Sequence, residues 1–307
     1  MLVNQATLEA LLKNFRAIYA SAYKEYTSMY PELAMVVPSS TLVEDYAWLG
    51  RMPKMREWLD ERTHQELAVY DWAIKNKDWE LTLDVDRNDI EDDRLGIYTP
   101  MVQMMAAEAA RHPDRLFFDL IDNGSAAAAL CFDGKSFFDT LHPTPGAESS
   151  TTYDNIGSLS FTRDHLVTTI GLMTKFVDAQ GEPLEVYPTH LIVHPDNAFA
   201  AQEIIASANI IIAGTAGSVT ERGNKNVLEG ILKIIVTPRI DAAHWYLLDC
   251  SRPIRPFAFQ MRRAPETVNT GVVANPNYFE RKKFAHGVDA RYNAGYLLPW
   301  LAFAQEP

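Results

Sequence analysis

The strongest constraint on the fold lies in two apolar stretches of the second half of the chain. Residues 188–209 contain a short apolar strand, Leu191 to Val193, followed by Pro195, a residue favoured in the first turn of a helix. The helix that follows would bury Ala198, Phe199, Ala201, Ile204 and Ile205. Residues 226–250 predict a β-branched strand, a turn at Pro238 and Arg239, and a second strand ending at Cys250. Together they predict one compact α+β unit.

Composition excludes several classes of protein. A chain of 307 residues that is 47% hydrophobic can bury a large core, in one elaborated domain or two. A net charge of −12 argues against an outer surface that grips nucleic acid. The cysteines, Cys131 and Cys250, lie far apart, which fits a reducing compartment. No signal segment or bilayer-length apolar run is present, so we expect a soluble protein made in the cytosol, without a membrane partner.

Charge is unevenly distributed along the chain. Residues 44–93 carry 15 acidic and 7 basic side chains, whereas residues 251–291 carry 8 basic and 3 acidic ones. Opposite charges of this kind could steer neighbouring copies together with fixed polarity. Ordinary solvated faces of a single subunit are the alternative interpretation.

The N-terminal third predicts a helix and a tryptophan-rich ribbon. Residues 7–27 have the apolar spacing of an amphipathic helix, with Thr7 as its cap. Residues 44–82 hold four of the six tryptophans, and alternation over 66–74 and 79–85 predicts a hairpin turning at Asn76 and Lys77. A two-stranded ribbon is marginal alone in water, so either the rest of the chain or another copy must cover it.

The middle of the chain predicts helices separated by loops. Thr99 and Pro100 would open a helix that buries Val102, Met105, Ala106 and Ala109, and Pro113 would start a second segment. Residues 125–160 read as loops. Ser160 or Thr162 would cap a helix stopped at Gly181, and residues 213–226 predict a flexible loop.

Each candidate catalytic or metal-binding site in the sequence lacks a residue that its chemistry requires. The acidic turn at residues 84–89 begins like a calcium loop but has Asp89 where glycine is required. His190 and His194 stand four apart on an extended strand, which is not the helical pair of a zinc enzyme. Cys131 and His142 lack a residue to orient them. We expect no cofactor, no metal and no enzymatic activity.

Five separated segments carry a resemblance to a known family. They are residues 34–41 (AMVVPSST), 46–51 (YAWLGR), 87–100 (RNDIEDDRLGIYTP), 133–143 (DGKSFFDTLHP) and 245–252 (WYLLDCSR). In this order they resemble the Mu-like major head subunit (gpT) family of tailed bacteriophages, from about residue 5 to the C-terminus.

The resemblance implies an α+β, tailed-phage major capsid (Johnson-type) fold. Its parts would be an N-terminal arm (1–44) that crosses a neighbour, an extended loop (45–91) on the next subunit, a peripheral domain (92–160) with a spine helix at 93–111, an axial domain (161–248), and a return to the peripheral domain (249–307). The loop at 214–226 would lie near the centre of each capsomer.

The implied function is a major capsid protein that encloses double-stranded DNA in an icosahedral virion. Expected partners are further copies as hexamers and pentamers, a separate scaffolding protein, a portal, a maturation protease and non-specifically contacted DNA, with assembly in the bacterial cytoplasm. Candidate inter-subunit contacts are Phe15, Trp48, Arg51, Trp58, Trp72, Trp79, Arg252, Arg255 and Arg262. No lysine cross-link is predicted.

Two rival functions remain open at this point. Encapsulin-type compartments share the fold and hold enzymes instead of a genome, so DNA within purified particles would separate the two. A soluble metal-dependent hydrolase using His190, His194 and the acidic turn would elute as a monomer with bound metal.

Overall fold

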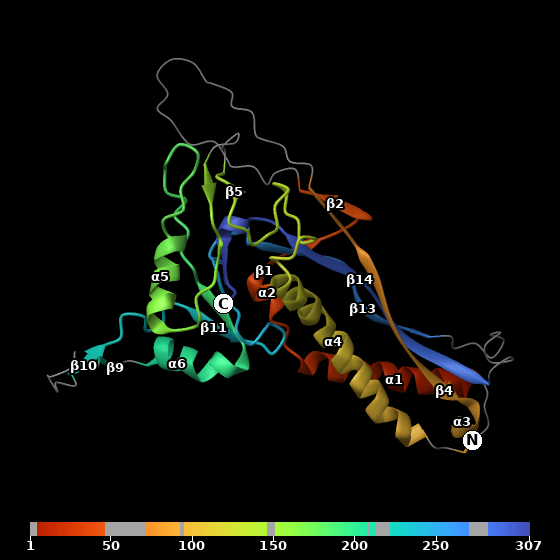
Figure 1. Cartoon of the computed structure of the whole chain (residues 1–307). Helices are drawn as coiled ribbons and strands as arrows, with labels where there is room; N and C mark the ends of the chain where they lie inside the picture. Colours follow the sequence, from red (N-terminus) through yellow and green to blue (C-terminus); the bar gives the residue numbers. More distant parts are fainter. Residues whose placement is uncertain are drawn as a thin grey trace, which may run out of the picture.

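The computed structural model describes residues 5–46, 72–92, 95–145, 151–207, 209–212, 222–269 and 282–307. It combines helices and sheets in two parts, one built on a long sheet with two long helices and the other on a five-stranded sheet (Figure 1). The predicted α+β class is confirmed.

The first part is a four-stranded sheet covered on one face by helices α1 (Gln5–Glu25) and α4 (Tyr98–Asp122) (Figure 1). Its strand order is β1 (Ala34–Pro38), β13 (Phe257–Asn269), β14 (Lys283–Tyr296), β4 (Lys77–Asp86). β1 runs parallel to β13, and the other two pairs are antiparallel. Short helices α2 (Tyr30–Leu33) and α3 (Arg87–Glu91) connect these elements.

The predicted ribbon at residues 66–85 does not form as a hairpin. β3 (Ala73–Lys75) pairs with β2 (Val43–Asp45), while β4 pairs along its whole length with β14. Pairing with β14 places Val85 in a core against α1 and α4, which a local two-stranded turn could not provide. The half of the ribbon before residue 72 lies outside the described residues.

Helix α4 is longer than the sequence predicts. Pro113 lies inside the helix and is buried, whereas the sequence placed a break there. Proline normally kinks a helix because it lacks an N–H, but here buried residues on both sides of it hold the helix in place. The helix begins at Tyr98 without a side-chain cap, so the predicted cap at Thr99 and the spine bounds of 93–111 are also wrong.

The second part is a mixed sheet in the order β11 (Lys233–Val236), β8 (His190–Val193), β12 (Trp245–Leu248), β15 (Ala302–Gln305), β7 (Ile156–Gly157). Helices α5 (Arg163–Met173) and α6 (Ala198–Ala206) lie beside it (Figure 1). The strand before Pro195 is confirmed, since Leu191, Ile192 and Val193 are all fully buried. β15 brings the C-terminal residues into this sheet.

Several local predictions are corrected in this part. Phe199 on α6 is 85% exposed, although Ala201 and Ile205 are buried as expected. Thr162 caps α5 by accepting the His165 N–H, but the helix ends at Met173 instead of continuing toward Gly181. At the N-terminus Thr7 lies inside α1. The loop predicted at 213–226 ends in β10 (Arg222–Lys225), which pairs with β9 (Asn209–Ile212).

The segment between α4 and α5 is loop-rich, as predicted. It contains the two-residue strands β5 (His142–Pro143) and β6 (Thr152–Tyr153). Short 3-10 turns complete the described chain: η1 (Leu95–Ile97), η2 (Pro195–Asn197) and η3 (Pro299–Leu301).

One aromatic core joins the two parts. Phe117 of α4 packs edge-on against both Phe118 of the same helix and Phe257 of β13, and Phe138 stacks on Tyr246 of β12 with ring centroids 5.5 Å apart. These rings belong to one buried cluster that draws residues from both sheets. The orientation of α4 is therefore tied to the five-stranded sheet by apolar burial.

Candidate inter-subunit surface

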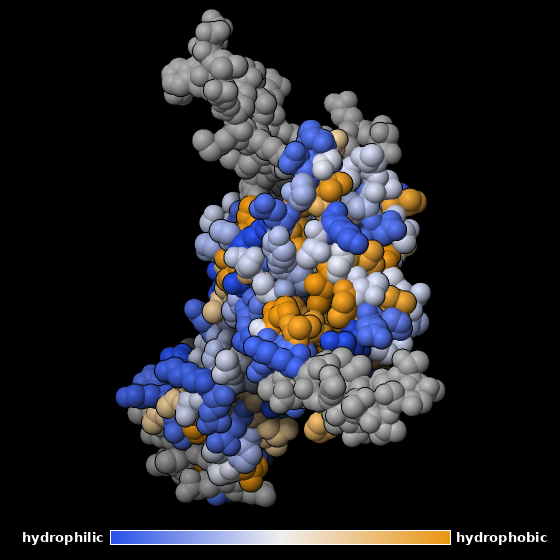
Figure 2. Space-filling view, turned by 90° about the vertical axis from the view of Figure 1, so that its left-hand side faces the viewer, coloured by the Kyte–Doolittle hydropathy of each residue, from blue (hydrophilic) through white to orange (hydrophobic). Residues whose placement is uncertain are grey.

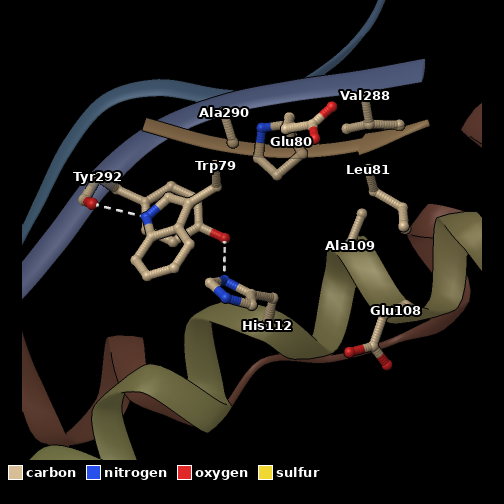
Figure 3. A pocket seen from close by; sticks show the side chains of 10 residues that line it. Trp79, Glu80, Leu81, Glu108, Ala109, His112, Val288, Ala290 and Tyr292 are labelled. Atoms are coloured by element: carbon tan, nitrogen blue, oxygen red, sulfur yellow. Dashed lines mark hydrogen bonds between the residues drawn. The ribbon is translucent and has the colours of Figure 1, made fainter. Parts of the chain in front are cut away.

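An open apolar cavity lies where edge strand β4 crosses helix α4 (Figure 3). Its volume is about 160 Å³, and the side chains that line it come from β4, β13, β14 and α4. The Trp79 indole N–H donates to the Tyr292 carbonyl at 3.0 Å, and the Tyr292 hydroxyl lies 2.7 Å from His112 Nδ1. Burial lowers the pKa of His112. An uncharged imidazole therefore completes an apolar wall.

A second depression continues the first along α4. It measures about 440 Å³, and Leu81 and Glu108 line both spaces. Met104 is 72% exposed and Met101 46% exposed on its floor. We call the two depressions together the spine groove. Methionine side chains adapt to differently shaped partners, which suits such a surface to binding another chain.

The spine groove is lined by charges of both signs, and one side of it is an open strand edge. Glu80, Glu108 and Arg111 line it, and Glu108 pairs with Arg115 at 2.7 Å. Within the described sheet β4 is an end strand, so the backbone groups of its outer edge face away from β14. Exposed strand edges are templates for pairing with another chain.

Comparison with known proteins identifies the family. A family model described as the Mu-like prophage major head subunit gpT matches residues 8–160, 157–240 and 239–307. The chain belongs to this family.

Two curated relatives agree with the family assignment. The chain is similar to the major capsid protein of Escherichia phage Mu, with 30% identity over 296 residues, covering 96% of this chain and 72% of that protein. It is also 28% identical to the Mu-like prophage FluMu major head subunit of Haemophilus influenzae, covering 92% of this chain and 67% of the relative. The chain is therefore a major capsid protein of the tailed-phage type.

Solved structures confirm the predicted capsid fold. A chain in the procapsid of bacteriophage JBD30 matches with a TM-score of 0.61 and 28% identity, covering 99% of this head subunit and 76% of that chain. The capsid of cyanophage P-SCSP1u, at 8% identity, shares the fold with a TM-score of 0.56, covering 91% of this chain and 88% of that one.

The predicted contact residues of this head subunit fall into four groups. Trp48, Arg51 and Trp58 lie outside the described residues. Phe15 is buried within its own chain, as part of the α1 core. The N-terminal helix thus does not need a second copy for burial, because α4 and the sheet already cover its apolar stripe.

The remaining tryptophans are partly covered by their own chain. Trp72 donates its indole N–H to the Tyr296 carbonyl at 2.9 Å and packs against the core below the five-stranded sheet. Trp79 lies in the spine groove with its ring 4.4 Å from that of His112. Both keep part of their surface exposed, so they can contribute to a contact while being held in place.

The basic candidates differ in how firmly they are held. Arg252 donates to the Leu184 and Glu185 carbonyls and lies 3.6 Å from the buried Asp249 carboxylate. Arg255 donates to the Pro31 and Ala34 carbonyls. Arg262 is exposed on β13, so its guanidinium group projects into solvent where another subunit could reach it.

Sequence reasoning missed the exposed apolar side chains. Met101 and Met104 fall off the buried stripe of α4, and that spacing could have marked them as surface residues. Val167 and Leu172 on α5 and Phe199 on α6 are exposed as well. Figure 2 shows apolar side chains gathered among polar ones on one face of the molecule. Surfaces of this kind mark protein contacts.

The candidate reactive residues have structural partners. His190 Nε2 lies 3.0 Å from the Glu32 carboxylate, and His194 accepts the Asp196 N–H. Contrary to the sequence expectation, a residue does orient His142, because Asp133 lies 2.6 Å from its Nδ1. Its Nε2 lies 3.1 Å from the Phe137 carbonyl, and burial raises the pKa of the Cys131 thiol, which disfavours the thiolate needed for nucleophilic attack.

The described residues contain no cluster of three metal-binding side chains, and none of their helices has the length and apolarity to cross a membrane.

Proposed function

We propose that this head subunit assembles as hexamers and pentamers into the icosahedral shell of a tailed phage and encloses its double-stranded DNA. The observation that supports this proposal is the family match, which extends along the chain. In addition, the structure leaves the spine groove and the β4 edge open for contact with another subunit. Capsid shells close through heterologous contacts, in which one surface of a subunit meets a different surface of its neighbour. The groove and edge supply one such surface.

The proposed division of labour follows the family pattern. Residues 1–44 form the arm, 45–91 the extended loop, 92–160 and 249–307 the peripheral domain, and 161–248 the axial domain. β7 and β15 lie within the peripheral-domain bounds, but we propose that they complete the sheet of the axial domain, because they pair with each other and β15 pairs with β12. The exposed Phe199 and Leu172 would then lie at contacts around the capsomer axis.

The spine groove is proposed to receive the loop segment of a neighbouring copy. Residues 51–58 combine Arg51, Lys54 and Arg56 with Met52, Met55 and Trp58. The apolar side chains of this segment suit the apolar floor of the groove, and its basic side chains would pair with Glu80. Trp48 would extend the contact, and Trp72, Trp79 and Arg262 would support it.

Other partners are proposed from the same role. A separate scaffolding protein, a portal and a maturation protease would act during assembly in the bacterial cytoplasm. The packaged DNA would be contacted weakly and without sequence preference, and the net charge of −12 fits a weak contact because it disfavours close approach to phosphates. We propose no enzymatic role for the chain.

Electron microscopy of the expressed chain, with and without its scaffolding protein, tests the proposal. Closed shells are expected, and a chain that remains a single-copy species in both conditions would refute it.

Met104→Glu tests the groove itself. The side chain is largely exposed, so the subunit should fold, yet a carboxylate on the apolar floor should prevent shell formation. Met104→Leu, the control, conserves volume and should assemble normally. Shells formed by Met104→Glu in wild-type yield would rule the spine groove out as a contact.

A further inference from the structure

The interface beneath helix α1 buries polar atoms that have no hydrogen-bond partner. His286 on β14 is 1% exposed, and among the described residues neither of its ring nitrogens finds a partner. The hydroxyl of Tyr19 on α1 is in the same state, with that side chain 5% exposed. Buried polar groups without partners cost free energy that is recovered when water reaches them. The docked position of α1 therefore carries a built-in penalty.

His286 lies directly against the apolar stripe of α1. Its ring centroid is 5.5 Å from that of Phe15, and both rings belong to the contact between α1 and β14. A protonated imidazole cannot be tolerated here, because a buried charge needs a partner that this apolar contact does not supply.

We propose that His286 is a proton-sensitive latch beneath the N-terminal arm, and that its protonation releases α1 from the sheet. The released helix would expose Leu11, Phe15 and Tyr19, an apolar stripe that could then bind elsewhere. This inference concerns the single chain and does not depend on the shell architecture proposed above.

The groups around His286 favour its neutral form in the docked state. Burial lowers the pKa of His286 below its ordinary value of 6.5, and Arg16 on α1 lowers it further. Its register partners, Leu83 on β4 and Asn269 on β13, carry no charge. Tyr19 and Tyr23 on α1 and Tyr98 on α4 are the other titratable groups in the cluster, and burial raises the pKa of all three hydroxyls. No described carboxylate offsets the penalty on the imidazolium.

The sign of the pH dependence follows. A histidine whose pKa is lower in the docked state binds its proton more readily after release, so docking is stable above the ordinary pKa and weakens as pH falls. One such proton changes the docking equilibrium by at most about tenfold per pH unit.

The chain has a natural pivot for this movement. Just after α1, the Asp114 carboxylate on α4 accepts hydrogen bonds from the Tyr26 hydroxyl and from the Met29 and Tyr30 backbone N–H groups. β1 then pairs with β13. Residues from 26 onward stay attached while α1 undocks, so the movement is confined to the first helix.

Amide hydrogen exchange of the unassembled full chain tests the proposal, with rates corrected for the intrinsic effect of pH. Protection of residues 11–25 is measured between about pH 7.5 and about pH 5.5. Below the ordinary histidine pKa of 6.5 it should fall by up to about tenfold per pH unit. His286→Phe should remove this dependence and raise protection at the lower pH. His165→Gln, which changes a histidine on α5, should behave as wild type.

Two results would overturn the latch. Constant protection of α1 in the wild-type chain across this pH range would do so without any variant. Equal pH dependence in wild type and His286→Phe would also do so. Should His286→Phe not fold, His286→Leu provides the same comparison with a smaller side chain.

Discussion

Asp114 provides the sharpest test of how the N-terminal arm is anchored. Its carboxylate is 1% exposed and accepts the Tyr26 hydroxyl at 2.7 Å, the Met29 N–H at 3.0 Å and the Tyr30 N–H at 2.9 Å. Hydrogen bonds to a charged group contribute about 1.5–3 kcal/mol each. Asp114→Ala leaves three donors without their acceptor, and partial access of water offsets some of that loss. The expected cost is about 4 kcal/mol of unfolding free energy.

Urea unfolding of the unassembled chain, followed by circular dichroism, measures this cost. Asp114→Asn keeps one acceptor oxygen but places its NH₂ group against the N–H and O–H donors that the carboxylate served. A loss of about 2 kcal/mol of unfolding free energy is therefore expected. Asp119→Ala changes an exposed carboxylate on the same helix and should stay within about 0.5 kcal/mol of wild type. If Asp114→Ala cost no more than Asp119→Ala, the carboxylate would not be the anchor.

Three further perturbations probe other parts of the molecule. Phe117→Ala empties a fully buried site in the aromatic core and should lower the unfolding free energy by about 3–5 kcal/mol in the same titration; a loss below about 1 kcal/mol would contradict that packing. Hydrogen bonds from the Ser39 hydroxyl and the adjoining backbone lower the pKa of Glu44 to about 2, so this turn should keep its amide protection above the ordinary carboxyl pKa and lose it as pH falls toward 2; unchanged protection in Glu44→Gln would disprove the link. Gly124→Ala would place a Cβ 2.6 Å from the Phe138 ring and should lower stability by about 1–3 kcal/mol in thermal unfolding, and a neutral result would mean that the ring moves aside.

The elements that sequence predicted well are those whose signals are local. The strand before Pro195 and the cap at Thr162 depend on residues within one turn of each other, and both are present. The buried stripe of α4 also follows from spacing alone. Predictions failed where a distant partner decided the outcome. β4 could not be assigned to β14 from its own residues, since the two strands lie about two hundred positions apart.

The sequence by itself determined the family, the α+β class and which helix faces are apolar, because these depend on residue identity and short-range periodicity. Only the tertiary structure decided that Pro113 stays within a helix, that α1 packs on its own sheet and that His286 is buried beneath it. In each case, burial against segments far away in the chain outweighs a local conformational preference of a few kcal/mol. Burial against distant segments cannot be predicted from neighbouring residues. The same packing of distant segments brings β4 and α4 together and so forms the spine groove.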